Sequence, residues 1–153
     1  MKVTNLAEFR TDLPDDAVWE GDEIVQFGGR GVATAIAELL GGLGYRVLEP
    51  ENGDEHGWWF TINQEDRQFY VQVTDLPPDI LLLVSDVTWA VNRWFSKNGH
   101  LYGELVEKLK AALAADPRFH DIRWRQEDSL GRELGPDGKP VVRRPRKPLA
   151  PYP

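Results

Sequence analysis

Apolar and polar residues alternate most regularly between residues 57 and 84, where three strand-like runs follow one another. The first two runs, residues 57–63 and 67–74, alternate with a period of two across a short polar link, which predicts a β-hairpin. The third run, residues 80–84, is continuously apolar, which predicts a strand that is buried on both faces. We expect these three strands to form the floor of the hydrophobic core.

Two other segments repeat their apolar residues every three or four positions, which is the spacing of one helical face. The pattern predicts helices over residues 31–43 and 101–115. Gly44 stands where a left-handed residue commonly ends a helix. Shorter strands are expected over residues 45–49 and 119–125.

The order of these elements predicts an α+β two-layer sandwich, with about five mainly antiparallel strands and both helices on one face of the sheet. Residues 1–128 are expected to form this single domain. Its first 26 residues are predicted to be an irregular acidic lead-in with at most a short edge strand, held to the body by Trp19 and Phe27. Residues 129–153 are rich in proline and basic residues and are expected to form an extended arm.

The composition indicates the cellular compartment in which we expect this protein. With 153 residues, 41% hydrophobic residues and six tryptophans, the chain has enough apolar material for a true core. It has no cysteine, which excludes cysteine nucleophiles and thiolate metal sites and fits a reducing compartment. The N-terminal residues lack the apolar stretch of a signal peptide, and no apolar run is long enough to span a bilayer. We expect a cytoplasmic protein.

The net charge of −7 is unevenly distributed along the chain. Residues 1–27 hold seven acidic and two basic residues, a net charge of −5, whereas residues 132–153 hold six basic and two acidic residues, a net charge of +4. An acidic body repels phosphates, so nucleic-acid binding by the folded domain is not expected. The acidic charge serves either solubility alone or attraction to a basic partner. The basic arm either touches anionic partners or packs on the acidic N-terminal segment of its own or a neighbouring chain, which would make a homodimer.

A glycine-rich sequence, Gly28, Gly29, Arg30 and Gly31, precedes the first predicted helix. Free amides at a helix start attract anions, so these four residues are a possible anion-binding site. The sequence lacks the Lys-Ser/Thr pair of a phosphate-binding P-loop, and a flexible turn that leads into the helix is the simpler interpretation.

Catalytic and metal-binding signals are weak. The acidic loop at residues 54–56 contains a histidine, but no second ligand group stands at a recognisable spacing from it. Ser85 and Asp86 follow the most apolar strand, where active sites often lie, yet no motif links a histidine to them. We therefore expect no catalytic residue, no metal and no cofactor.

The strongest functional signal is aromatic. If Trp58 faces the core, Trp59 and Tyr70 lie together on the opposite face of the predicted hairpin, beside Gln72. An uncovered Trp–Tyr pair would be a recognition patch, with nearby acids attracting the partner. Alternatively, the lead-in or the arm covers this face, and Trp59 belongs to a second small core. The predicted partner-binding residues are Trp59, Tyr70, Gln72, Asp54, Glu55, Glu65, Asp66, Trp89 and Arg93.

In size, charge and scarcity of catalytic motifs the chain resembles bacterial immunity proteins of toxin–immunity pairs and secretion chaperones; no specific motif carries this resemblance. It implies a non-catalytic protein-binding module that occludes a basic partner. A second hypothesis is a protein or enzyme that binds a small ligand or phosphate at the glycine-rich helix start. A third is an assembly subunit that docks through its C-terminal arm.

Overall fold

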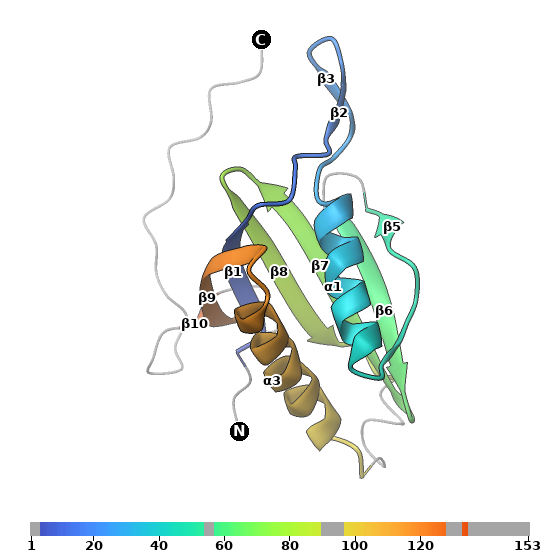
Figure 1. Cartoon of the computed structure of the whole chain (residues 1–153). Helices are drawn as coiled ribbons and strands as arrows, with labels where there is room; N and C mark the ends of the chain where they lie inside the picture. The colour runs from blue at the N-terminus through green and yellow to red at the C-terminus, as the bar shows by residue number, and fades with distance from the viewer. Residues whose placement is uncertain (1–3, 54–56, 90–96, 128–132, 135–153) are drawn as a thin grey trace.

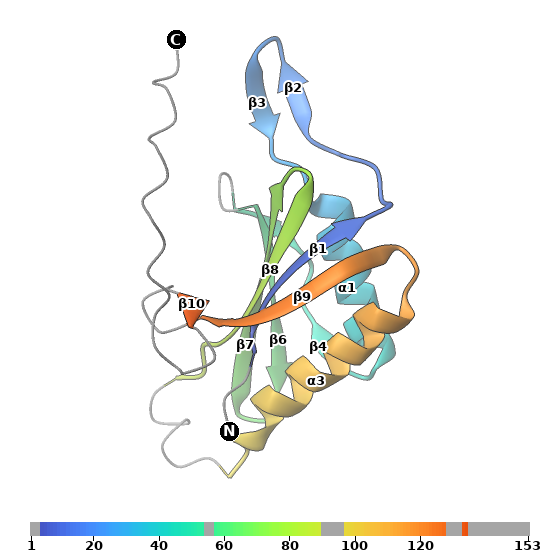
Figure 2. The ribbon, with the colours of Figure 1, turned by 90° about the vertical axis from the view of Figure 1, so that its left-hand side faces the viewer.

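The chain has an α+β fold in two layers (Figure 1). The structure is a computed structural model that describes residues 4–53, 57–89, 97–127 and 133–134. In this described part, two helices lie on the same side of a mainly antiparallel sheet, as Figure 2 shows with the sheet nearly edge-on. The predicted fold class is confirmed.

In the described residues the sheet has eight strands, in the order β10-β9-β1-β8-β7-β6-β4, with β5 also paired to β6. A separate two-stranded ribbon is made of β2 and β3. Among the described residues, neither helix is long and apolar enough to cross a membrane. The strands are β1 Leu6–Thr11, β2 Val18–Glu20, β3 Glu23–Gln26, β4 Arg46–Val47, β5 Glu51–Asn52, β6 Trp58–Gln64, β7 Arg67–Leu76, β8 Asp79–Asp86, β9 Phe119–Glu127 and β10 Glu133–Leu134, and the helices are α1 Arg30–Gly42 and α3 His100–Ala115.

One continuous core lies between the sheet and the two helices. Every second residue of β6, β7 and β8 points into it. For β6 and β7 this confirms the predicted period of two. Both helices turn their predicted apolar stripe toward the same core. The largest fully buried side chains are Phe9, Phe60, Phe69, Ile36, Leu40, Ile62, Leu82, Leu105, Leu109, Leu113, Val71 and Val73.

The C-terminus of α1 has the glycine cap that the sequence predicts. Gly44 adopts a left-handed φ of 96°. Its amide donates to the carbonyl of Gly41 at 3.0 Å, and the amide of Tyr45 donates to the carbonyl of Leu40 at 3.1 Å. This pair of hydrogen bonds is a Schellman motif, which satisfies carbonyl groups at the end of the helix and turns the chain toward β4.

The N-terminal lead-in differs from the prediction. Leu6–Thr11 is not an irregular segment or an edge strand but an inner strand, which pairs with β8 on one side and with β9 on the other. Its buried residues Ala7 and Phe9 alternate with the partly exposed Leu6 and Glu8. An alternation of only six residues, half of them polar, is too short to stand out in sequence.

Trp19 does not hold the lead-in to the body, as the sequence suggested. It lies in β2 with 56% of its surface exposed, on a ribbon that projects beyond the end of the sheet (Figure 1). Phe27 does contact the body, because its carbonyl oxygen accepts a hydrogen bond from Nε1 of Trp58 at 3.0 Å. The lead-in is therefore anchored at β1 and again at Phe27, with the ribbon free between these two points.

A buried ion pair ties the start of β7 to the end of β8. Arg67 is 5% exposed, and its guanidinium donates to Oδ2 of Asp86 at 2.9 Å. The other carboxylate oxygen of Asp86 accepts from the amide of Thr88 at 3.0 Å, and the Thr88 hydroxyl accepts from the amide of Gln68 at 3.0 Å. These bonds give Asp86, the position that sequence favoured most for catalysis, a structural role.

We predict that Gly57→Ala destabilises the fold strongly. Gly57 has a φ of 87°, and an added Cβ would collide with the backbone carbonyl of Val73 in the neighbouring strand. The left-handed backbone alone costs a non-glycine residue roughly 1–2 kcal/mol, and the collision adds to this cost. Urea unfolding should show a loss of at least about 2 kcal/mol.

Gly41→Ala is the matched control. A Cβ at Gly41 in α1 meets no atom within 4 Å, and its φ is not positive. Its unfolding free energy should stay unchanged or rise by about 0.5–1 kcal/mol. Equal stabilities for the two variants would contradict the close approach at Gly57.

Candidate protein-binding surface

The sheet face opposite the helices is built by residues that pair across five strands. Leu6 of β1 lies opposite Leu83 of β8, Leu83 lies opposite Gln72 of β7, and Gln72 lies opposite Trp59 of β6. Both helices of the described part lie on the other side of the sheet (Figure 2). We call this surface the open face. Its members are Leu6, Glu8, Trp59, Tyr70, Gln72, Thr74, Leu81, Leu83, Arg123 and Arg125.

The predicted aromatic pair forms one end of the open face. The rings of Trp59 and Tyr70 lie 5.7 Å apart between centroids, inclined by 30°. The Tyr70 hydroxyl donates to Oε1 of Gln72 at 3.0 Å, and Nε2 of Gln72 donates to the hydroxyl of Thr74 at 3.3 Å. Partial burial raises the pKa of Tyr70 above its ordinary value, so the hydroxyl stays a donor at neutral pH. These bonds hold the Tyr70 ring in place before any partner arrives, and the Trp59 ring packs against it.

Leucines occupy the middle of the open face. Leu81 and Leu83 alternate along β8 with Leu82, which points into the core. The sequence predicted that this strand is buried on both faces, but Leu81 and Leu83 are only partly buried. With Leu6 beside Leu83, they place apolar surface next to the aromatic pair. Partly buried leucines at the centre of a sheet are apolar surface that a partner can still cover.

The far end of the open face carries an ion-pair cluster. Glu8 of β1 binds Arg123 at 3.0 Å and Arg125 at 2.7 Å, both from β9. Arg123 is 70% exposed, whereas Glu8 and Arg125 are mostly covered. The open face is therefore aromatic at one end, aliphatic in the middle and ion-paired at the other end.

Two of the predicted acids, Glu65 and Asp66, lie at the opposite end of β6 from Trp59. Trp59 lies near the start of β6, whereas Glu65 and Asp66 form the turn that follows the end of this strand. Glu65 is exposed, and Asp66 accepts a hydrogen bond from Asn98 at 3.0 Å. Their attraction would therefore act from the edge of the surface.

The remaining predicted residues extend past the sheet or fall outside the described chain. Trp89 follows the end of β8 and is 73% exposed. Asp54, Glu55 and Arg93 lie outside the described residues. The structure thus brings together Trp59, Tyr70 and Gln72 of the predicted set, and their grouping with the rest stays a prediction.

The glycine-rich helix start already holds an anion of the chain itself. Asp16 accepts hydrogen bonds from the amides of Gly29 at 2.8 Å and Gly31 at 2.7 Å, one on each carboxylate oxygen. A carboxylate at a helix N-terminus satisfies free amides and interacts favourably with the helix dipole. Arg30 turns away and lies 5.6 Å from the centroid of the Trp58 ring. An external anion would have to replace Asp16 at these amides.

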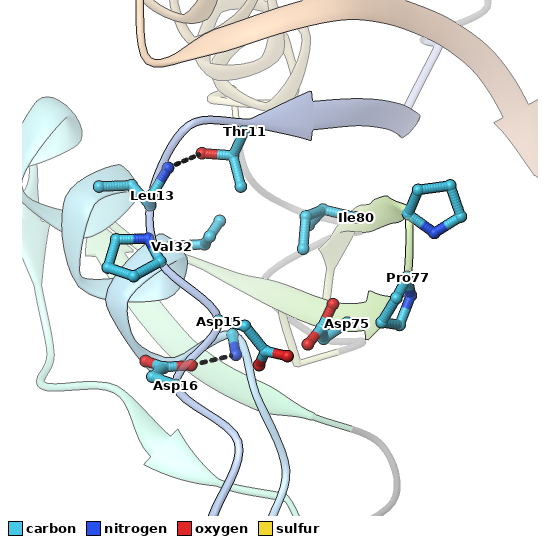
Figure 3. Close-up of a pocket in the computed structure, with 11 residues that line it drawn as sticks. Thr11, Leu13, Asp15, Asp16, Val32, Asp75, Pro77 and Ile80 are labelled. Atoms are coloured by element: carbon cyan, nitrogen blue, oxygen red, sulfur yellow. Dashed lines mark hydrogen bonds between the residues drawn. The ribbon is translucent and has the colours of Figure 1, made fainter.

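A small cavity beside this helix start is lined by carboxylates (Figure 3). Its volume is about 160 Å³, and Asp15, Asp16 and Asp75 line it together with apolar residues of the lead-in and of the β7–β8 turn. Burial, with smaller contributions from Asp15 and Asp16, raises the pKa of Asp75 above its ordinary value. The Asp75 carboxylate also crowds the backbone of Gly28, where a Cβ would collide with it.

The chemistry of this cavity does not favour a phosphate. Three carboxylates of like charge repel an anion, and the two amides that would attract one are occupied by Asp16. Within the residues that the structure describes, no group of three or more His, Cys, Asp or Glu side chains is placed to hold a metal ion. Anion binding by Gly28–Gly31 stays a prediction. In the structure, an external anion would compete with the Asp16 carboxylate for the amides of Gly29 and Gly31.

The fold places His120 between two carboxylates. Its Nε2 lies 3.0 Å from Asp12, and its Nδ1 lies 3.0 Å from Asp121. Hydrogen bonds to Asp121 and Asp12 raise the pKa of the imidazole. This exposed cluster joins the end of β1 to the start of β9.

Several residues of the surface and the cavity carried no signal in sequence. Asp16 lies 13 positions before Gly29, whose amide it binds. Asp75 lies on β7 and lines the same cavity only because the fold brings β7 next to this helix start. Glu8 and Arg125 become partners because β1 inserts beside β9. The continuous apolar run of residues 80–84 did not reveal that Leu81 and Leu83 face away from the core, because its residues are all apolar.

We predict that Asp16→Ala destabilises the chain by about 1–2 kcal/mol, because the amides of Gly29 and Gly31 lose their acceptor. Asp16→Asn keeps one acceptor oxygen and should lose less. Thermal and urea unfolding measure both variants, with Asp22→Ala at the exposed ribbon turn as a control. A loss no larger than that of the control would contradict the capping role.

We predict that Asp75→Asn makes the chain more stable at neutral pH. Since burial raises the pKa of Asp75 in the folded state, the folded chain binds this proton more tightly than the unfolded chain does. Stability therefore falls as the pH rises from the unfolded-state pKa through the raised folded-state pKa. The variant should lack this fall in urea unfolding free energies measured across the window. Asp22→Asn is the control, and parallel pH profiles for wild type and Asp75→Asn would contradict the prediction.

Comparisons of this chain with protein-family models, with curated proteins and with solved structures found no match.

Proposed function

We propose that the chain is a non-catalytic protein-binding module that holds its partner on the open face. The observation that carries this proposal is the Trp59–Tyr70 pair beside partly exposed leucines on a broad sheet face, with both described helices on the opposite side. Tryptophan and tyrosine are the residues most enriched at binding hot spots. A prearranged pair costs little conformational entropy on binding.

The shape and extent of the surface favour a protein partner over a small ligand. The open face runs across strands β6, β7, β8, β1 and β9, and its residues stand on rigid sheet positions. Small-molecule sites are typically concave cavities of roughly 300–1,000 Å³. The carboxylate-lined cavity of about 160 Å³ is smaller and lies at the helix start, away from the aromatic pair.

The charge of the chain favours a basic partner. The net charge is −7, and the first 27 residues carry seven of the 25 acidic residues but only two basic ones. Such a field attracts a basic protein over distances of about a Debye length and speeds its association, while the apolar centre of the open face supplies the lasting contact. The mechanism is occlusion: the module covers a surface of its partner, as an inhibitor or a chaperone does.

Selection of peptides from a random library against the full chain tests this function without knowledge of the partner. The selected peptides should combine basic with aromatic or aliphatic residues and should bind less tightly at high salt. Trp59→Ala and Leu83→Asp should each weaken their binding by tenfold or more, about 1.4 kcal/mol.

Leu43→Ala is the matched control, because Leu43 is an exposed leucine at the end of α1, away from the open face. It should bind the selected peptides as wild type does. Circular dichroism checks that each variant is folded. If the peptides bind folded Trp59→Ala and Leu83→Asp as tightly as wild type, the open face is not the binding surface and the proposal fails.

A further inference from the structure

The β2–β3 ribbon leaves apolar surface exposed without a covering element in the described chain. Val18 and Val25 are each 46% exposed and Trp19 is 56% exposed. A two-stranded ribbon is marginally stable by itself, and the described structure gives β3 no neighbour other than β2. One edge of β3 is therefore free for another strand, which is the usual template for strand addition.

The ribbon is also strongly acidic. Glu20, Asp22 and Glu23 are all exposed, and residues 17–29 contain no basic residue. A segment that pairs with β3 should therefore be short and extended, and it should present both a valine-like and a basic residue on one face.

The C-terminal arm contains a segment with this chemistry. Residues 141–144 read Val-Val-Arg-Arg and stand between Pro140 and Pro145, which limits a strand here to four residues, the length of β3. In an antiparallel pairing, Val142 opposite Val25 places Arg144 opposite Glu23. Both pairs then fall on the same exposed strand face, because residues two apart share a face.

The segment of the same chain would need an almost fully extended link to reach the ribbon. Leu134 pairs with Gln126 and Thr11 pairs with Phe119, so Leu134 and Thr11 lie about 24 Å apart along β9. The ribbon projects beyond the end of β1 (Figure 1). The seven residues from Leu134 to Val141 span at most about 25 Å when fully extended. A neighbouring chain has no such limit.

We propose that residues 141–144 of a second copy of this chain add as an antiparallel strand to the free edge of β3, with Val142 against Val25 and Arg144 against Glu23. Two copies that exchange their arms in this way form a symmetric dimer, in which each ribbon receives the other chain's arm. This contact is separate from the open face, and it stands or falls independently of the proposed function.

Light scattering and sedimentation of the full chain over a concentration series test the dimer. At low salt the mass should rise to twice the 17.4 kDa of the chain, and at high salt it should fall toward the monomer, because screening weakens the Glu–Arg contacts. A monomer at every concentration at low salt would overturn the proposal.

Charge reversal identifies the two surfaces. Glu20→Lys/Glu23→Lys on the ribbon and Arg143→Glu/Arg144→Glu on the arm should each give monomers. A mixture of these two variants should restore the dimer, because each arm then meets a ribbon of opposite charge. The control Glu38→Lys/Glu49→Lys makes the same change of net charge as the ribbon variant, at exposed positions elsewhere, and should stay dimeric. Dimers that survive both reversals, or a mixture that stays monomeric, would exclude this contact.

A disulfide cross-link tests the register and the source of the strand, since the chain has no native cysteine. Val25→Cys and Val142→Cys, carried on two separate chains, should form a disulfide between chains when mixed under oxidising conditions. Val142→Cys mixed with Ala114→Cys on the exposed side of α3 should not. A chain that carries both Val25→Cys and Val142→Cys and closes a disulfide within itself would assign the strand to its own arm and overturn the exchange. Trp59→Ala and Leu83→Asp should remain dimeric, which separates this result from the test of the open face.

Discussion

The insertion of β1 between β8 and β9 is the constraint on which the rest of the fold depends. β1 is hydrogen-bonded to both neighbours and supplies the buried Ala7 and Phe9, whose ring meets Phe119 of β9 edge-on at 5.4 Å. Without β1, the strands β4 to β8 would end at an unpaired apolar edge, and β9 would lose its pairing to the sheet. An open edge of that kind is costly and prone to aggregation, because backbone groups remain unsatisfied beside apolar side chains. The N-terminal strand β1 therefore joins strands β4 to β8 and strand β9 into one sheet.

The open face follows from this one-sided architecture. Both described helices pack on the same side of the sheet, so the alternation of each strand sends one set of residues into the core and the other set to the opposite surface. A surface of this kind is commonly polar, yet here it holds a Trp–Tyr pair at one end and leucines at its centre. The retention of large apolar side chains on the side away from the helices is the physical basis of the protein-binding proposal.

Some of the acidic side chains near the N-terminus make contacts within the protein, and others are exposed to solvent. Asp16 caps α1 from a position far away in sequence and thereby joins the lead-in to the helical layer. The same contact places it beside Asp15 and Asp75, where burial and like charge oppose ionisation of Asp75. The acids of the β2–β3 ribbon are exposed, and they stand next to exposed apolar residues. The chain thus presents an open face of mixed character and a separate acidic ribbon.

The sequence by itself determined the elements whose patterns are local and regular. Both helices, the central hairpin, the Gly44 cap and the opposite placement of Trp58 and Trp59 could be predicted, because helical stripes, strand alternation and glycine caps depend on residues that are close in sequence. Only the tertiary structure decided the place of β1, the exposure of Trp19, the cap by Asp16 and the partial exposure of Leu81 and Leu83. Each of these depends on which distant strand or helix becomes the neighbour, and the burial of a side chain is set by that neighbour rather than by its own local pattern.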